Sequence, residues 1–137
     1  MNKRKVEQLL PKAIEALNHE PSKIKKTDEK GVYIEKGFRG QISSFGAAVT
    51  MGSFRAAVAF FGNNGESDVE RSELIRAMYY MVKDEWLPAK DIVREIVSIR
   101  DNAQLMRMKE DFINASVALK LALNAFRLEE KSKTKTK

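Results

Sequence analysis

The chain has 137 residues, and its 25 Lys and Arg residues outnumber its 19 Asp and Glu residues, which gives a formal net charge of +6. This length is sufficient for one domain with a buried core, and the basic surplus is compatible with a polyanionic partner. The absence of cysteine excludes disulfides and thiolate chemistry, and a single histidine excludes a multi-histidine metal site.

The first predicted element is an amphipathic helix that ends near Asn18, because apolar residues recur at helical spacing from Val6 onward. Pro11 lies inside this pattern and predicts a kink or a restart. A second helix is predicted to begin near Val32 and to end near Val49. On a helical wheel its apolar face holds Ile34, Phe38, Ile42 and Phe45, whereas Lys36, Arg39 and Ser43 lie on the opposite side.

Residues 42–62, ISSFGAAVTMGSFRAAVAFFG, contain one charged side chain, that of Arg55. This charge and the many Ala, Ser and Gly residues make the segment too polar for a membrane span. We predict two short helices that meet at Gly52, with Ser53 as the N-cap of the second helix.

The C-terminal half is predicted to hold three further helices. Ser67 and Glu70 form an S-x-x-E pattern typical of a capping box, and residues 86–88 are predicted to turn into a short helix. The last helix is predicted to begin near Asp101 and to extend to about Leu128, with a buried near-heptad stripe. No segment alternates with period two, so we predict no sheet.

The predicted fold class is therefore all-α, a compact bundle of about five to six helices. Residues 1–130 form a single helical domain, and residues 131–137, KSKTKTK, are predicted to be a disordered Lys-rich tail because they have nothing to bury.

Several function classes lack their chemical parts. The chain has no cysteine and its one histidine, His19, lies in a predicted linker, so nucleophilic triads lack parts, and no phosphate-binding G-x-x-x-x-G-K-[ST] loop is present. The carboxylates of residues 66–73 are explained by the preference for acids in the first turn of a helix. We predict a cytoplasmic protein that is not an enzyme and has no metal and no cofactor. Residues 72–97 also allow a helix-turn-helix reading, although acids outnumber bases there.

The best candidate surface is the strip of Lys36, Arg39 and Ser43, with Arg55 beyond the helix break. Two long cations about one turn apart, a hydroxyl and small neighbours suit contacts to the backbone of a flexible anionic strand. An ordinary solvated helix face, with Arg55 as a cation at the edge of the core, is the alternative interpretation.

Residues 33–62, YIEKGFRGQISSFGAAVTMGSFRAAVAFFG, resemble the signature region of the small subunit of the Cmr-type (type III-B) CRISPR effector complex. In that family a Tyr-initiated helix with basic residues leads through a Gly-containing break into an Ala-Ala-Phe helix. The resemblance implies a non-catalytic, all-helical subunit for antiviral defence. Such subunits stack in several copies beside other effector subunits and contact guide RNA and single-stranded target RNA.

The resemblance also implies which residues contact RNA. They are Lys36, Arg39, Gln41, Ser43, Ser44 and Arg55, with Lys120 and Arg127 as further candidates. The apolar side of residues 42–62 is expected to be core, and the small side an interface for neighbouring subunits. Two alternatives stay open: the small subunit of a type III-A complex, and a helical protein-interaction module without nucleic-acid binding, for instance a dimer through the stripe of residues 105–126.

Overall fold

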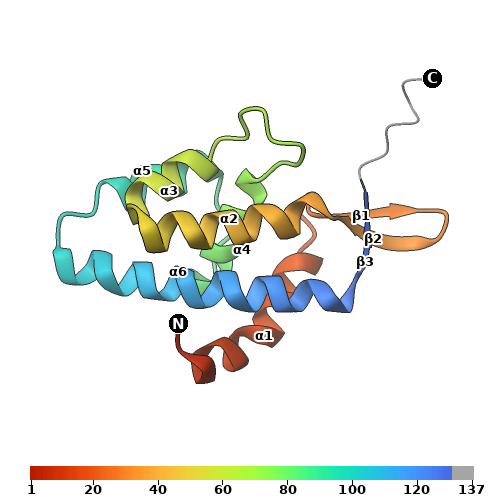
Figure 1. Ribbon diagram of the computed structural model, residues 1–137, viewed down its shortest axis with the longest axis horizontal. Helices are drawn as coiled ribbons and strands as arrows, with labels where there is room; N and C mark the ends of the chain where they lie inside the picture. The colour runs from red at the N-terminus through yellow and green to blue at the C-terminus, as the bar shows by residue number, and fades with distance from the viewer. Residues whose placement is uncertain (131–137) are drawn as a thin grey trace.

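The computed structural model describes residues 1–130, so the predicted disordered tail at residues 131–137 lies outside the described residues. Six helices form most of the molecule (Figure 1), and a small sheet lies at one end. The elements in chain order are α1 (Lys3–Asn18), β1 (Lys25–Asp28), β2 (Gly31–Glu35), α2 (Gly37–Met51), α3 (Phe54–Phe61), α4 (Ser72–Lys83), α5 (Ala89–Val97), α6 (Asn102–Ala122), a 3-10 turn (Leu123–Ala125) and β3 (Arg127–Glu129). None of the described helices is long and apolar enough to cross a membrane.

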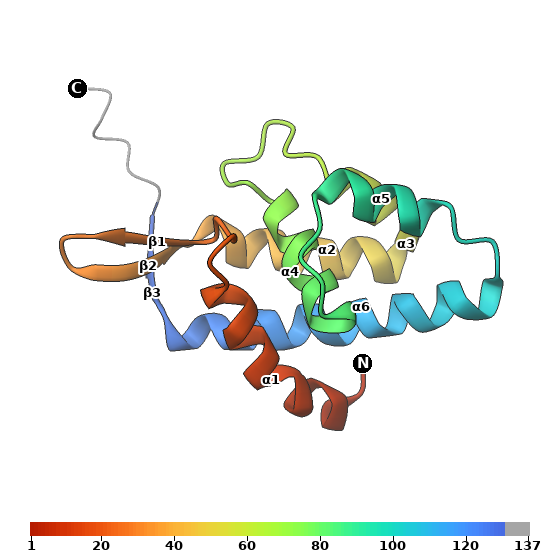
Figure 2. The ribbon, with the colours of Figure 1, turned by 180° about the vertical axis from the view of Figure 1, so that it is seen from behind.

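Helix α6 is the longest helix and the centre of the packing. It contacts α1, α2 and α4. Figure 1 shows α2 running along α6, and the opposite view in Figure 2 shows α1 and α4 on the far side. The predicted stripe of α6 faces this core: Met108, Phe112, Ala115, Leu119 and Ala122 are all buried. The stripe therefore packs within the chain and is not free to form the dimer that was the example for the alternative of an interaction module.

Three helix boundaries follow the sequence pattern. Helix α1 ends at Asn18 as predicted, and it continues through Pro11 without a restart. The break between α2 and α3 falls at Gly52, where a Cβ atom would lie 2.9 Å from the carbonyl oxygen of Ala48. Ser53 caps α3, since its hydroxyl accepts a hydrogen bond from the Ala56 amide at 3.2 Å.

The prediction of a structure without strands is wrong, because the described residues include a three-stranded sheet. Strands β1 and β2 form an antiparallel hairpin, and β2 pairs with β3 in parallel. The sequence shows no alternation of apolar and polar residues here, because β1 has the sequence KKTD with no buried residue and β2 buries only Ile34. Ion pairs accompany the backbone pairing of the strands: Arg127 Nη2 lies 2.6 Å from Asp28 Oδ1, and Arg127 Nη1 lies 2.7 Å from Glu129 Oε2.

The sheet also changes two predicted helix ends. The second helix begins at Gly37 instead of near Val32, because residues 31–35 belong to β2. The last helix ends at Ala122 instead of near Leu128, since the chain passes through a 3-10 turn into β3. Ile34 in β2 and Phe38 in α2 are both buried, and they are four residues apart, as on one face of a helix. This spacing explains why the predicted helix began too early.

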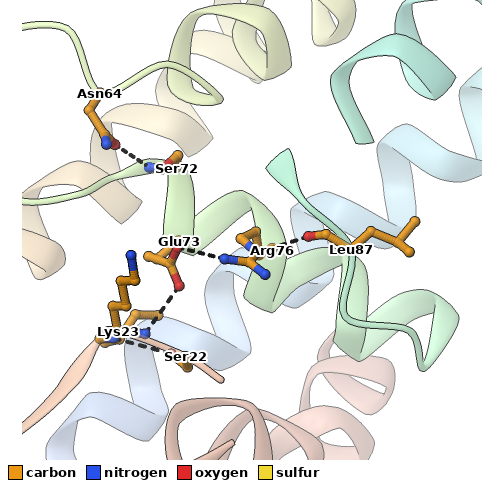
Figure 3. A network of polar contacts seen from close by, with 8 residues as sticks. Ser22, Lys23, Asn64, Ser72, Glu73, Arg76 and Leu87 are labelled. Atoms are coloured by element: carbon orange, nitrogen blue, oxygen red, sulfur yellow. Dashed lines mark hydrogen bonds and ion pairs between the residues drawn. The ribbon is translucent and has the colours of Figure 1, made fainter. Parts of the chain in front are cut away.

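The predicted capping box is wrong as well. Helix α4 begins at Ser72, and the hydroxyl of Ser67 accepts a hydrogen bond from the Val69 amide at 3.3 Å. The group that binds the first amide of α4 is the Asn64 side chain, whose Oδ1 accepts from Ser72 N at 2.9 Å (Figure 3). An Asn in the preceding loop thus replaces the local Ser and Glu pair.

A buried carboxylate connects α4 to two distant segments (Figure 3). Glu73 is 3% exposed, and its Oε2 lies 3.0 Å from Nη1 of Arg76. Its Oε1 accepts a hydrogen bond from the Lys23 amide at 3.1 Å, between α1 and β1. Arg76 in turn donates from Nε to the Leu87 carbonyl at 2.8 Å. The network fixes the linker before the sheet and the linker before α5 against one helix.

We expect Glu73→Gln to lower the free energy of unfolding by about 1–2 kcal/mol, because both hydrogen bonds lose a charged acceptor. Urea unfolding followed by far-UV circular dichroism measures this change. The matched control is Glu70→Gln, which neutralises an exposed carboxylate three residues earlier and should change stability by no more than about 0.5 kcal/mol. Equal effects of the two substitutions would contradict the role of the network.

Candidate nucleic-acid interface

The predicted cations of α2 lie where α2 begins, beside the end of α6. Lys36 is the residue before α2, and its Nζ lies 3.7 Å from Glu130 Oε2, with 57% of the Lys36 side chain exposed. Arg39 is exposed and donates from Nη2 to Asn124 Oδ1 at 2.9 Å. The exposed ion pair of Lys36 and the exposed hydrogen bond of Arg39 to a neutral amide are both weak, so both cations can bind another group such as a phosphate instead.

A groove of about 670 Å³ runs between α2 and α6. The α2 wall consists of small or uncharged side chains. Its residues are Ile42, Ser43, Gly46, Ala47, Thr50 and Met51. At Gly46 a Cβ atom would meet nothing nearer than Ser116 Oγ at 4.0 Å, so the middle of the groove stays open. Of the predicted strip, Ser43 lines the groove itself, and Arg39 lies one turn before it.

The α6 wall contributes the charges of the groove. Lys109 and Lys120 line it, with Ile113 and Ser116 between them, and Glu110 is the one carboxylate that residues 1–130 place there. Eleven residues separate the two lysines, which places them on the same face of α6 and about 16 Å apart along its axis. Neither lysine forms an ion pair within residues 1–130. Arg39 and Lys36 do not line the groove but lie beyond its end, beside Asn124 and Glu130.

Sequence reasoning missed Lys109 and Thr50 and named Lys120 through the resemblance alone. The positions 109, 113, 116 and 120 follow the same i, i+4, i+7, i+11 spacing as the buried stripe, one residue further on. This spacing could have identified a second face of α6. The pairing of that face with α2 depends on the fold and has no counterpart in the sequence.

Arg55 and Ser44 lie away from the groove. Arg55 is half-buried on α3, where it donates from Nη2 to the Ile99 carbonyl, and its Nε is buried without a hydrogen-bond partner among the described residues. This is the arrangement of the alternative interpretation, a cation at the edge of the core. Gln41 is half-buried and lines neither wall.

Arg127 is committed to the sheet. Its hydrogen bond lowers the pKa of the Asp28 carboxyl below the usual range, and a second carboxylate, that of Glu129, also binds the guanidinium. The cation is therefore neutralised by its own chain, in contrast to Lys109 and Lys120.

The carboxylates of residues 66–73 form no candidate metal site. Glu73, the last of them, is paired with Arg76. Among residues 1–130 no three His, Cys, Asp or Glu side chains gather as a possible metal site.

A second groove, of about 610 Å³, lies between α2 and α3, and none of the described residues that line it is charged. Ser44 lines it, together with alanines of both helices. Met51 and Phe60 are its most exposed apolar side chains, with 86% and 60% of their surfaces exposed. Phe60 is partly covered by Arg71, whose guanidinium carbon lies 4.2 Å from the ring centre.

The groove between α2 and α6 can therefore hold an anionic strand, and the groove between α2 and α3 can hold apolar side chains of another protein. Comparison with protein-family models, curated proteins and solved structures finds no match for this chain.

Proposed function

We propose that this chain is a non-catalytic, RNA-binding scaffold subunit of a Cmr-type (type III-B) CRISPR effector complex in the cytoplasm. In this proposal the groove between α2 and α6 binds the phosphate backbone of guide or single-stranded target RNA. The observation that supports RNA binding is the groove itself, which has an open wall on α2 and two lysines on α6 that form no ion pair within residues 1–130. The resemblance of residues 33–62 to the Cmr-type small subunit supports membership in this effector complex. The small subunit of a type III-A complex is the nearest alternative.

The chemistry of the groove favours the backbone over the bases. Lysine ammonium groups act as point charges toward phosphates, and contacts of this kind carry no sequence information. No exposed aromatic ring lines this groove, so base stacking is not part of the proposal for the described surface. Binding is therefore expected to be independent of sequence and sensitive to salt.

The groove between α2 and α3 supports the scaffold part of the proposal. Ten uncharged residues line it, and its exposed Met51 and Phe60 are suited to apolar side chains of a neighbouring subunit or of another copy of the chain. The same groove favours the second candidate function, a helical interaction module that binds protein and no nucleic acid.

The test is the affinity of the full chain for an unstructured single-stranded RNA over a series of salt concentrations. The expected slope of log K against log salt is about −0.7 for each phosphate contacted, or about −3 if the two groove lysines and Arg39 and Lys36 beyond its end each contact one phosphate. An affinity that is undetectable at low salt, or that does not change with salt, would contradict RNA binding.

A tagged pull-down from the native host then tests the assembly. Repeat-derived guide RNAs together with a stoichiometric set of effector proteins are the expected result. A protein partner recovered without RNA would favour the interaction module.

A further inference from the structure

Two hydroxyl groups of α2 face the groove between α2 and α6. Ser43 and Thr50 both line this groove, both are exposed, and neither side chain makes a hydrogen bond within residues 1–130. They are seven residues apart, so they share one face of α2 and lie about 10 Å apart along its axis. Between them Gly46 and Ala47 have no side chain long enough to block access to the hydroxyls.

The hydroxyls lie across the groove from the lysines. Arg39 contacts Asn124 at one end, and Gly46 lies opposite Ser116 further along, so α2 and α6 run antiparallel. This register brings Ser43 opposite Lys120 and brings Thr50 within about one turn of Lys109. A strand in the groove therefore meets cations on the α6 wall and uncharged hydroxyls on the α2 wall. If phosphates bind to the α6 wall, as the proposed function requires, the sugars face the α2 wall.

We propose that Ser43 and Thr50 hydrogen-bond to ribose 2′-hydroxyls, so that the groove binds RNA in preference to DNA. This inference rests on the proposed function, because it requires a nucleic-acid strand in this groove. A serine or threonine hydroxyl both donates and accepts, as the ribose 2′-hydroxyl does, and the 2′-hydroxyl is the group by which proteins distinguish RNA from DNA. Deoxyribose offers no partner, and a protein hydroxyl that the strand shields from water is then left unpaired.

Ser44 provides an internal comparison on the same helix. It is also an exposed serine of α2, but it lines the groove between α2 and α3. The Ser44→Ala substitution deletes the same hydroxyl group from the neighbouring position and leaves the lining of the groove between α2 and α6 unchanged. A general effect of losing a serine from α2 is thereby separated from an effect on sugar recognition.

The experiment measures binding of the full chain to an unstructured single-stranded RNA and to a deoxyribose oligonucleotide of the same base sequence, with deoxyuridine in place of uridine. We expect the unmodified chain to bind the RNA roughly tenfold more tightly, from two added hydrogen bonds. The Ser43→Ala/Thr50→Val double variant should lose this preference, because RNA loses its two added hydrogen bonds and the deoxyribose strand no longer leaves two protein hydroxyls unpaired; the salt slope should not change. Ser44→Ala should keep the preference.

The outcomes separate the two proposals. Equal, salt-sensitive binding of both strands by the unmodified chain overturns the 2′-hydroxyl inference and leaves the proposed function in place. A preference that persists in the double variant overturns the assignment to Ser43 and Thr50. Failure to bind either strand overturns the proposed function. Because the first comparison uses the unmodified chain, it does not depend on whether a variant folds.

Discussion

Reversing the charge of both groove lysines, in a Lys109→Glu/Lys120→Glu double variant, should lower the affinity for single-stranded RNA by roughly 100-fold at low salt. Each lysine lies on the α6 wall without an ion-pair partner in residues 1–130, so its charge is free to bind a phosphate. Each glutamate adds repulsion where there was attraction. Fluorescence anisotropy over a salt series measures the loss, and the slope of log K against log salt should decrease in magnitude by about 1.4.

The control for this prediction changes the net charge by the same amount at another surface. Lys83 at the end of α4 and Lys90 on α5 are both exposed, and neither lines the groove between α2 and α6. A Lys83→Glu/Lys90→Glu variant should lose only the small long-range part of the attraction, which salt screens. Equal losses in the two double variants would mean that the overall charge drives binding, which contradicts a specific groove.

The largest expected effect on stability comes from Phe112→Ala, which should lower the free energy of unfolding by about 3–5 kcal/mol. The Phe112 side chain is fully buried, and its ring centre lies 5.3 Å from that of Phe54 and 6.4 Å from that of Phe45. It thus joins α6 to α3 and α2. A domain of this size has a total stability of about 5–15 kcal/mol, so the variant loses a large share of it. Urea unfolding followed by far-UV circular dichroism gives the difference.

The matched substitution is Phe60→Ala, which removes the same side chain from the surface. Phe60 is 60% exposed and contacts Arg71 and the edge of Phe61. Its loss should cost no more than about 1 kcal/mol, since an exposed cation–π contact contributes about that much. A Phe112→Ala chain as stable as the Phe60→Ala chain would show that α6 is not the centre of the core.

The helices and the core were predictable because burial follows helical spacing there. The stripe from Met108 to Ala122 and the break at Gly52 are examples. The sheet was not predictable by the same means. Its strands are three to five residues long, and the ion pair that crosses it joins Asp28 to Arg127, which are 99 residues apart in the chain. A contact of that sequence separation leaves no periodic signal in either segment.

The candidate site was partly predictable for a similar reason. The helical wheel placed Lys36, Arg39 and Ser43 on the face of α2 that the structure leaves exposed. The opposite wall depends on which helix packs beside α2, and amphipathic periodicity shows where a face points but not what it meets. Arg55 shows the opposite error. A lone cation in an apolar segment suggested a residue that binds RNA, whereas its guanidinium donates a hydrogen bond to the Ile99 carbonyl of its own chain.

Ala47 and Met51 line both the groove with α6 and the groove with α3, so a single helix separates the two candidate ligands. Two ligands that contact the same side chains are thermodynamically coupled, and the coupling is reciprocal. If a protein bound beside α3 changes the affinity for RNA by some factor, RNA must change the affinity for that protein by the same factor. Assembly of the chain with its neighbours and loading with RNA would then be one linked equilibrium, set by the side chains of a single helix.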